Sequence, residues 1–230
     1  MTQIAQYKYF ALMLTSFALV GCATTGKPDP LDREGVMQNP KQPVYLLSMT
    51  LRNNVKPKPP RVLEVEIEKE NATQDDIDHL IFKTDKRGVV RGKVENTYYF
   101  RMEGEKGKYH VKSIRGEANY YPMICRFEVP LFMDIPSDKP GVYYLGHVDA
   151  TVREAKGDEF RAGPLLPILD QMVCGFPDGT FEVKITDELA SDKAKFLQMY
   201  PSLQNADIQT TLLPPHDRSR AQRWWAPAVR

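Results

Sequence analysis

Apolar and polar residues alternate with a period of two along most of the chain beyond residue 44, and this pattern constrains the fold more than any other feature. Neighbouring side chains of a β-strand point to opposite faces, so a period of two predicts strands with one buried face. The clearest runs are 63–68, 98–103, 125–133 and 181–185, and further strands are expected at 45–52, 109–115, 142–153 and 208–213.

Turns rich in glycine or proline separate these runs, and eighteen prolines against fourteen glycines favour stiff connections and few helices. Many short strands with such turns predict a mainly β protein, an antiparallel β-sandwich of immunoglobulin-like or prealbumin-like type. One helix is expected in the C-terminal half, over 187–200, where Pro201 ends it. A second, short helix is expected to start near Thr73.

The alternation also assigns side chains to faces. In 63–68 the apolar residues are expected to face the core, and the three glutamates between them are expected to lie in water. The apolar residues of 125–133 share one face, but Pro130 cannot donate a hydrogen bond to a neighbouring strand. This strand is therefore predicted to be an edge strand or a bulged one.

The first 21 residues have the composition of a secretory signal. Residues 1–10 contain one lysine, Lys8, and no acid, and 9–20 form an uncharged, mostly apolar run of 12 residues. A transmembrane helix needs about 20 apolar residues, so this run is too short for a stable anchor. Its length is typical of the apolar region of a signal peptide.

The residues that end this run, Leu19-Val20-Gly21-Cys22, resemble the lipobox of bacterial lipoproteins. The resemblance implies cleavage between Gly21 and Cys22, attachment of diacylglycerol to the Cys22 thiol, and acylation of its amino group by a fatty acid such as palmitate. Because Ala23 rather than aspartate follows, it implies delivery to the outer membrane of a Gram-negative cell, or display on the plasma membrane of a Gram-positive one. Several acyl chains, at about 0.8 kcal/mol per buried methylene, make such an anchor effectively permanent.

These features divide the chain into a signal peptide (1–21), a flexible tether (22–43), a β-sandwich domain (44–213) and a basic tail (214–230). The segment 139–146 resembles a turn and strand of sandwich domains in uncharacterised bacterial lipoproteins, a short similarity that implies no known activity.

Two cysteines remain after lipidation of Cys22, namely Cys125 and Cys174. In an oxidising compartment we expect them to form a disulfide that closes a loop of about 50 residues. The alternative is two buried thiols too far apart to bond, because the sequence does not supply their Cα separation. Neither lies in a CxxC motif, so redox catalysis is not indicated.

Charge and motifs argue against several functions. The chain has 31 basic and 30 acidic residues, and removal of 1–21 deletes Lys8 and leaves 30 of each. Nucleic acid is not an expected partner, because its binding proteins carry a basic excess or stripe. The histidines lack the spacing of metal ligands, and no catalytic or phosphate-binding motif is present, so we expect no metal, no cofactor and no catalysis. The histidines are His79, His110, His147 and His216.

Aromatic residues recur in pairs, at 98–99, 120–121, 143–144 and 224–225. Each tyrosine pair is expected to send one ring to the core and one outward, where it binds a glycan or peptide or packs against a neighbouring strand. Trp224 and Trp225 lie close to Arg220 and Arg223, a composition that suits a membrane interface or an acidic partner. Docking of this tail onto the domain is an equally good interpretation.

Three functions fit these features. The first is a non-catalytic, lipid-anchored module that contacts an envelope protein or another envelope component. The second is a periplasmic or surface protein that binds a small ligand or glycan, for which a preformed apolar pocket with convergent polar groups would be evidence. The third is an envelope hydrolase around His147 and Asp149, which requires a serine, cysteine or metal ligand within hydrogen-bond reach of His147.

Overall fold

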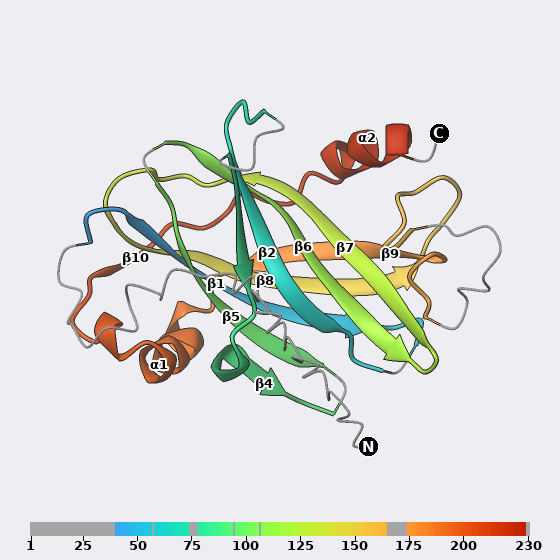
Figure 1. Ribbon diagram of the computed structural model, residues 1–230, viewed down its shortest axis with the longest axis horizontal. Coiled ribbons are helices and arrows are strands. Elements are labelled where there is room, and N and C mark those ends of the chain that lie inside the picture. The colour runs from blue at the N-terminus through green and yellow to red at the C-terminus, as the bar shows by residue number, and fades with distance from the viewer. Residues whose placement is uncertain are drawn as a thin grey trace, which may run out of the picture.

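Two β-sheets packed face to face form the protein (Figure 1), in a computed structural model that describes residues 40–56, 58–73, 78–93, 95–105, 107–164 and 174–228. The predicted signal peptide, the lipobox and nearly all of the tether lie outside these residues, as do residues 74–77 of the short helix expected after Thr73. Among the described residues, no helix combines the length and the apolar character needed to cross a bilayer.

The secondary structure consists of ten strands and two helices in the described part of the chain. The strands are β1 (Pro43–Asn53), β2 (Arg61–Lys69), β3 (His79–Lys83), β4 (Val89–Arg91), β5 (Asn96–Glu103), β6 (Tyr109–Tyr120), β7 (Met123–Asp134), β8 (Gly141–Glu154), β9 (Gly179–Thr186) and β10 (Ile208–Thr210). The helices are α1 (Leu189–Met199) and α2 (Arg218–Ala228), and short 3-10 turns lie at Lys86–Gly88 and Pro201–Leu203.

The larger sheet has the order β10-β8-β1-β5-β4, with β9 also paired to β8, and the smaller sheet has the order β3-β2-β6-β7. The predicted mainly β sandwich with a helix in its C-terminal half is confirmed. All pairings of the smaller sheet are antiparallel, whereas β8 is parallel to both β1 and β10 in the larger sheet. Parallel pairing is possible because the chain crosses to the smaller sheet and back between β1 and β8.

The main core lies between the inner faces of the sheets. Tyr45, Leu47 and Met49 project inward from β1 and meet Val65 of β2 and Val129 of β7, all fully buried. The sandwich therefore follows from the alternation, because burial of one face of each strand removes its apolar side chains from water.

A second apolar cluster lies on the outer face of the larger sheet, beneath α1. Val44 and Leu46 of β1 and Tyr144 of β8 project from this face, and Phe196 and Leu203 cover them. The helix predicted over 187–200 is thus confirmed, and it gives β1 a cover on both faces.

The predicted faces of β2 are wrong at two positions. A β-bulge at 62–64 shifts the alternation, so that Leu63 is only half-buried. Glu66, expected in water, is 5% exposed because cationic side chains of β6 cover it. The nearest nitrogens of Lys112 and Arg115 lie 3.0 and 3.2 Å from its oxygens. A carboxylate is tolerated there because cations accompany it.

Cys125 and Cys174 form a disulfide with their Cα atoms 6.2 Å apart, which confirms the expected pairing. Cys125 lies on β7, and Cys174 precedes β9, so the bond joins the two sheets near one edge of the sandwich.

The prediction from Pro130 is also confirmed, since β7 is an edge strand whose register with β6 shifts next to this proline. Phe132 lies in the resulting bulge with a φ of 49°. Bulges redirect side chains, and here the ring of Phe132 packs against Trp224 of α2, with ring centroids 5.7 Å apart.

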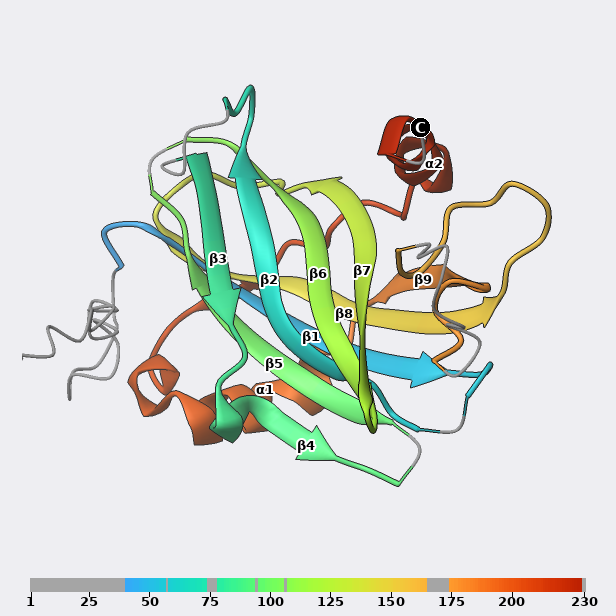
Figure 2. The ribbon, with the colours of Figure 1, turned by 45° about the vertical axis from the view of Figure 1, so that its right-hand side comes forward.

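Helix α2 closes the edge of the sandwich between β7 and β9 (Figures 1 and 2). Its Ala221 is fully buried in the main core. Arg220 donates to the carbonyl of Phe132 on β7, and Arg218 donates to the carbonyl of Phe181 on β9, each at 2.6 Å. These bonds occupy main-chain acceptors of two edge strands, which limits edge pairing with other chains. The tail was interpreted either as a segment for a membrane or an acidic partner, or as a segment that docks onto the domain. Its helix α2 is docked onto the domain.

Candidate functional site

A cleft of about 490 Å³ lies between the outer face of the smaller sheet and α2, and we call it the Trp cleft. Its volume is typical of small-molecule sites. Strands β2, β6 and β7 form its floor, and the loop 161–164 and α2 form its walls. Its apolar lining comprises Leu63, Phe127, Pro164, Trp224 and Trp225, and its charged lining comprises Glu64, Arg115, Glu117, Arg126, Glu128 and Arg161.

Both tryptophans of the sequence line this cleft. Trp224 is half-buried against Phe132, and Trp225 is half-buried against the main core. Of the two arginines singled out with them, Arg220 lies over the Phe132 ring at 5.7 Å, whereas Arg223 is exposed and donates to a serine of its own helix. The tryptophans therefore form part of a site, and the two arginines do not line it.

The loop after β8, which leads into the cleft wall, holds α2 through Gln222 of that helix. The backbone nitrogen of Phe160 donates to Gln222 Oε1 at 2.6 Å, and Gln222 Nε2 donates to the carbonyl of Asp158 at 2.8 Å. Because Phe160 is fully buried, these bonds connect the helix to a fixed point of the core.

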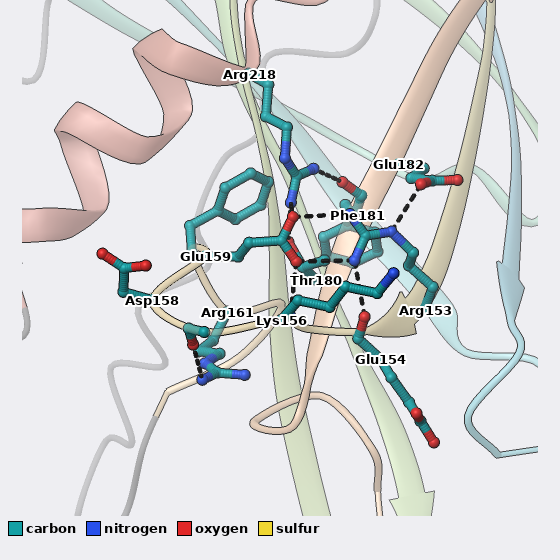
Figure 3. Close-up of polar contacts among 12 residues, drawn as sticks. Arg153, Glu154, Lys156, Asp158, Glu159, Arg161, Thr180, Phe181, Glu182 and Arg218 are labelled. Atoms are coloured by element: carbon teal, nitrogen blue, oxygen red, sulfur yellow. Dashed lines mark hydrogen bonds and ion pairs between the residues drawn. The ribbon is translucent and has the colours of Figure 1, made fainter.

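An ion network fixes the start of α2 (Figure 3). Glu159 accepts hydrogen bonds from Arg153 at 2.8 Å and from Arg218 at 2.9 Å. Arg218 also donates to Thr180 Oγ1 at 2.8 Å, and Arg153 donates to Glu182 at 2.7 Å. The hydrogen bond from Arg153 lowers the pKa of Glu159 to about 2. The network joins β8, β9, the loop after β8 and α2, and so positions the helix that carries the tryptophans.

The arginines of the Trp cleft differ in their partners. Arg115 pairs with Glu64 at 2.9 Å within the smaller sheet. Arg126 and Arg161 form no ion pair with a carboxylate in the described part of the chain, and Arg161 donates to the carbonyl of Gly157 at 2.9 Å. Two guanidinium groups beside two indole rings provide donors and flat apolar surfaces for a ligand rich in oxygen.

The hydrolase hypothesis required a partner for His147, and Ser48 is within reach. Ser48 Oγ lies 2.8 Å from His147 Nδ1 and also donates to Asp192. The side chain of Ser48 is fully buried beneath α1, so a substrate has no access to its oxygen. Asp149 does not join this cluster and accepts a hydrogen bond from Arg52 at 2.5 Å. The cluster connects α1 to the larger sheet and offers no exposed nucleophile.

Helix α1 also covers the outward rings of two tyrosine pairs. Tyr99 and Tyr144 lie on the outer face of the larger sheet, but Phe196 packs on them with ring centroids 5.3 and 6.2 Å away. Tyr144 donates to Asp192 at 2.6 Å. Burial, together with Asp192, raises the pKa of Tyr99 to about 12. These two rings therefore pack against α1 and form no open binding surface, whereas Tyr121 of the pair 120–121 is exposed.

A cluster of possible metal ligands lies on the outer face of the smaller sheet, where one atom from each of Glu66, Glu68 and His79 lies within 4.8 Å of the others. A cation is already present, because Lys112 Nζ lies 3.0 and 2.9 Å from the two glutamates. The imidazole nitrogens face Glu66 at 3.1 Å and the carbonyl of Thr73 at 3.0 Å, and the latter bond chiefly raises the pKa of His79. Both imidazole nitrogens and both glutamates are therefore already engaged by partners within the protein.

Sequence reasoning identified the tryptophans of the Trp cleft but missed Arg126, Arg161 and the loop 161–164. These residues come from separate segments and share no local pattern, so only the fold brings them together.

Comparison with known proteins leaves the function to be argued from these residues. No protein-family model, no curated protein and no solved structure matches this chain.

Proposed function

We propose that this protein is a lipid-anchored, non-catalytic binding module of a bacterial outer membrane, and that its β-sandwich binds an envelope saccharide in the Trp cleft. The observation that carries the binding role is the Trp cleft itself, a preformed hollow with two indoles and two arginines that lack carboxylate partners in the described structure.

Anchoring is supported by the four residues that end the apolar run, Leu19-Val20-Gly21-Cys22. The disulfide is consistent with a location in the cell envelope, because such bonds form and persist in oxidising compartments. A tether rich in proline would separate the domain from the lipid headgroups.

A saccharide fits the chemistry of the Trp cleft. The C–H face of a sugar ring is flat and apolar, and indole rings supply a matching surface. Sugar hydroxyls accept hydrogen bonds from Arg126 and Arg161 and donate to Glu117 or Glu128. A non-catalytic role is supported by the burial of Ser48, the serine bonded to His147.

The anchor is tested by replacing Cys22 and then fractionating membranes. Cys22→Ser should leave the protein without lipid and release it from membranes, whereas Ala23→Asp should keep the lipid and retain the protein in the inner membrane. The anchoring proposal would be rejected if Cys22→Ser still fractionated with the outer membrane, or if the wild-type protein had an unmodified N-terminus.

The binding role is tested by the tryptophan fluorescence of the mature chain, since both reporters lie in the Trp cleft. Oligosaccharides released from peptidoglycan by muramidase are the probe, and saturable changes in emission are expected. Arg126→Ala should weaken binding about 10-fold, the usual loss for one charged hydrogen bond. Arg223→Ala, on the same helix as the reporters but outside the lining, should leave Kd unchanged. Equal effects of both substitutions, or no saturable change, would overturn the saccharide assignment.

A further inference from the structure

Two of the large apolar side chains that the described structure exposes to water lie three residues apart, at the tip of the β6–β7 hairpin. Tyr121 is 94% exposed and Ile124 is 61% exposed, and Pro122 between them is also exposed. Soluble proteins expose single apolar residues freely, but a cluster at a protruding turn marks a contact site.

The hairpin behind this tip is firmly held. Cys125, the residue after Ile124, forms the disulfide to Cys174, and Ala118 opposite Cys125 is buried. Lys58 donates to the carbonyl of Asn119. Exposure of the apolar tip is therefore a property of a fixed turn.

Basic residues surround the tip, although the whole chain is almost neutral. Lys58 lies over the Tyr120 ring at 5.2 Å, and Arg126 follows on β7. Lys56 lies beside Gly175, next to the disulfide, and Arg61 lies opposite Glu117 of β6 and lines a hollow with Arg91. Of the acidic residues at this end, Glu117 pairs with Arg61 and Glu95 pairs with Arg52, while Asp178 is exposed in the loop that contains Gly175.

The tip lies at the far end of the domain from the point where the chain enters it. Strand β1 starts at Pro43 beside Gly141 and Glu103, and it ends at Asn53, whose side chain donates to the carbonyl of Cys174. The β6–β7 turn lies at this second end, as both ribbon views show (Figures 1 and 2).

We propose that the β6–β7 tip inserts into the interfacial layer of a lipid bilayer with anionic headgroups. Peripheral proteins place aromatic and aliphatic side chains in the interfacial layer of the bilayer and surround them with basic residues. Tyr121 and Ile124, with the basic residues near them (the basic collar), form this combination. The collar attracts anionic headgroups within a Debye length of the surface. A protein partner fits less well, because stable interfaces bury about 800 Å² per partner and three side chains on a turn supply far less. This proposal does not depend on the lipid anchor, and it shares only Arg126 with the saccharide site.

The test uses the mature chain with Cys22→Ser, so that no acyl chain contributes, and sedimentation with vesicles of phosphatidylcholine with or without phosphatidylglycerol. The protein should bind the anionic vesicles, less strongly as salt increases. Tyr121→Ser combined with Ile124→Ser should reduce partitioning about 10-fold, because two apolar side chains are lost from the bilayer. The matched control, Ile81→Ser with Leu212→Ser, removes two exposed apolar residues elsewhere and should not change it.

A second measurement places a reporter at the tip. Tyr121→Trp, in a chain with Trp224→Phe and Trp225→Phe, should shift its emission to shorter wavelength when anionic vesicles are added. Absence of wild-type sedimentation, equal loss in the tip and control variants, or an unshifted Tyr121→Trp emission in the presence of bound vesicles would each overturn the proposal. Loss of saccharide binding in Arg126→Ala alone bears only on the Trp cleft.

Discussion

Removal of the Cys125–Cys174 crosslink should strongly destabilise the domain. The two residues are 49 positions apart, and the crosslink restricts a loop of that length in the unfolded chain. The loop-closure entropy for about 50 residues corresponds to about 4 kcal/mol at 25 °C. For a domain of this size, about 2–4 °C of melting temperature is lost per kcal/mol, so Tm should fall by about 8–16 °C.

The assay compares chemical unfolding of the oxidised mature chain with that of the same chain in dithiothreitol. Reduction keeps both sulfur atoms in place, so the difference isolates the crosslink. The variant with Cys125→Ala and Cys174→Ala should lose somewhat more, because Cys174 is fully buried and its sulfur packs in the core. A loss below about 1 kcal/mol on complete reduction would refute the loop-closure argument. Two free thiols in protein isolated from the envelope would refute the pairing.

Three further results are expected. Asp192→Ala removes the acceptor of the buried Tyr144 hydroxyl and one of the partners of Ser48, so it should cost about 3 kcal/mol in urea unfolding, whereas the exposed Asp207→Ala should cost almost nothing. Glu159 has a folded pKa of about 2 against an ordinary 4.5, so its contribution is present above pH 4.5 and is lost as pH falls towards 2. Glu159→Gln should therefore flatten the stability–pH curve in that window by about 1 kcal/mol, a value reduced by solvent screening, and an unaltered curve would contradict the network. Ala221→Asp buries a charge against the core and should detach α2, seen as red-shifted tryptophan emission that the exposed Ala226→Asp does not produce.

Much of the fold could be predicted because it depends on local patterns. The alternation at 125–133 and 181–185 located β7 and β9, and Pro130 alone indicated that β7 is an edge strand or a bulged one. The pairing of Cys125 with Cys174 followed from the count of cysteines once Cys22 was assigned to lipid. The face of Leu63 was missed, because a bulge depends on the partner strand and leaves no mark in the alternation.

The candidate site was less predictable. The indoles at 224–225 were noticed, but their position against β7 depends on Phe132, a bulged residue far away in the sequence. Each tyrosine pair was expected to send one ring outward, and Tyr121 is indeed open to water, whereas α1 covers Tyr99 and Tyr144. Alternation separates the two faces of a strand but does not say which neighbour covers the outer one.

By itself, the sequence determined eight of the described strands, the helix over 187–200 and the residues available for a disulfide, but it indicated neither β3, β4 nor α2. It also carries the lipobox pattern on which the anchoring proposal rests. These properties depend on residues close together in the sequence, whose separation is fixed by the covalent chain. Only the tertiary structure decided that β8 lies parallel to β1, that Glu66 is buried among cations, and that α2 encloses a cleft. Such features depend on contacts between distant segments, which form only when burial of both sheets has brought those segments together.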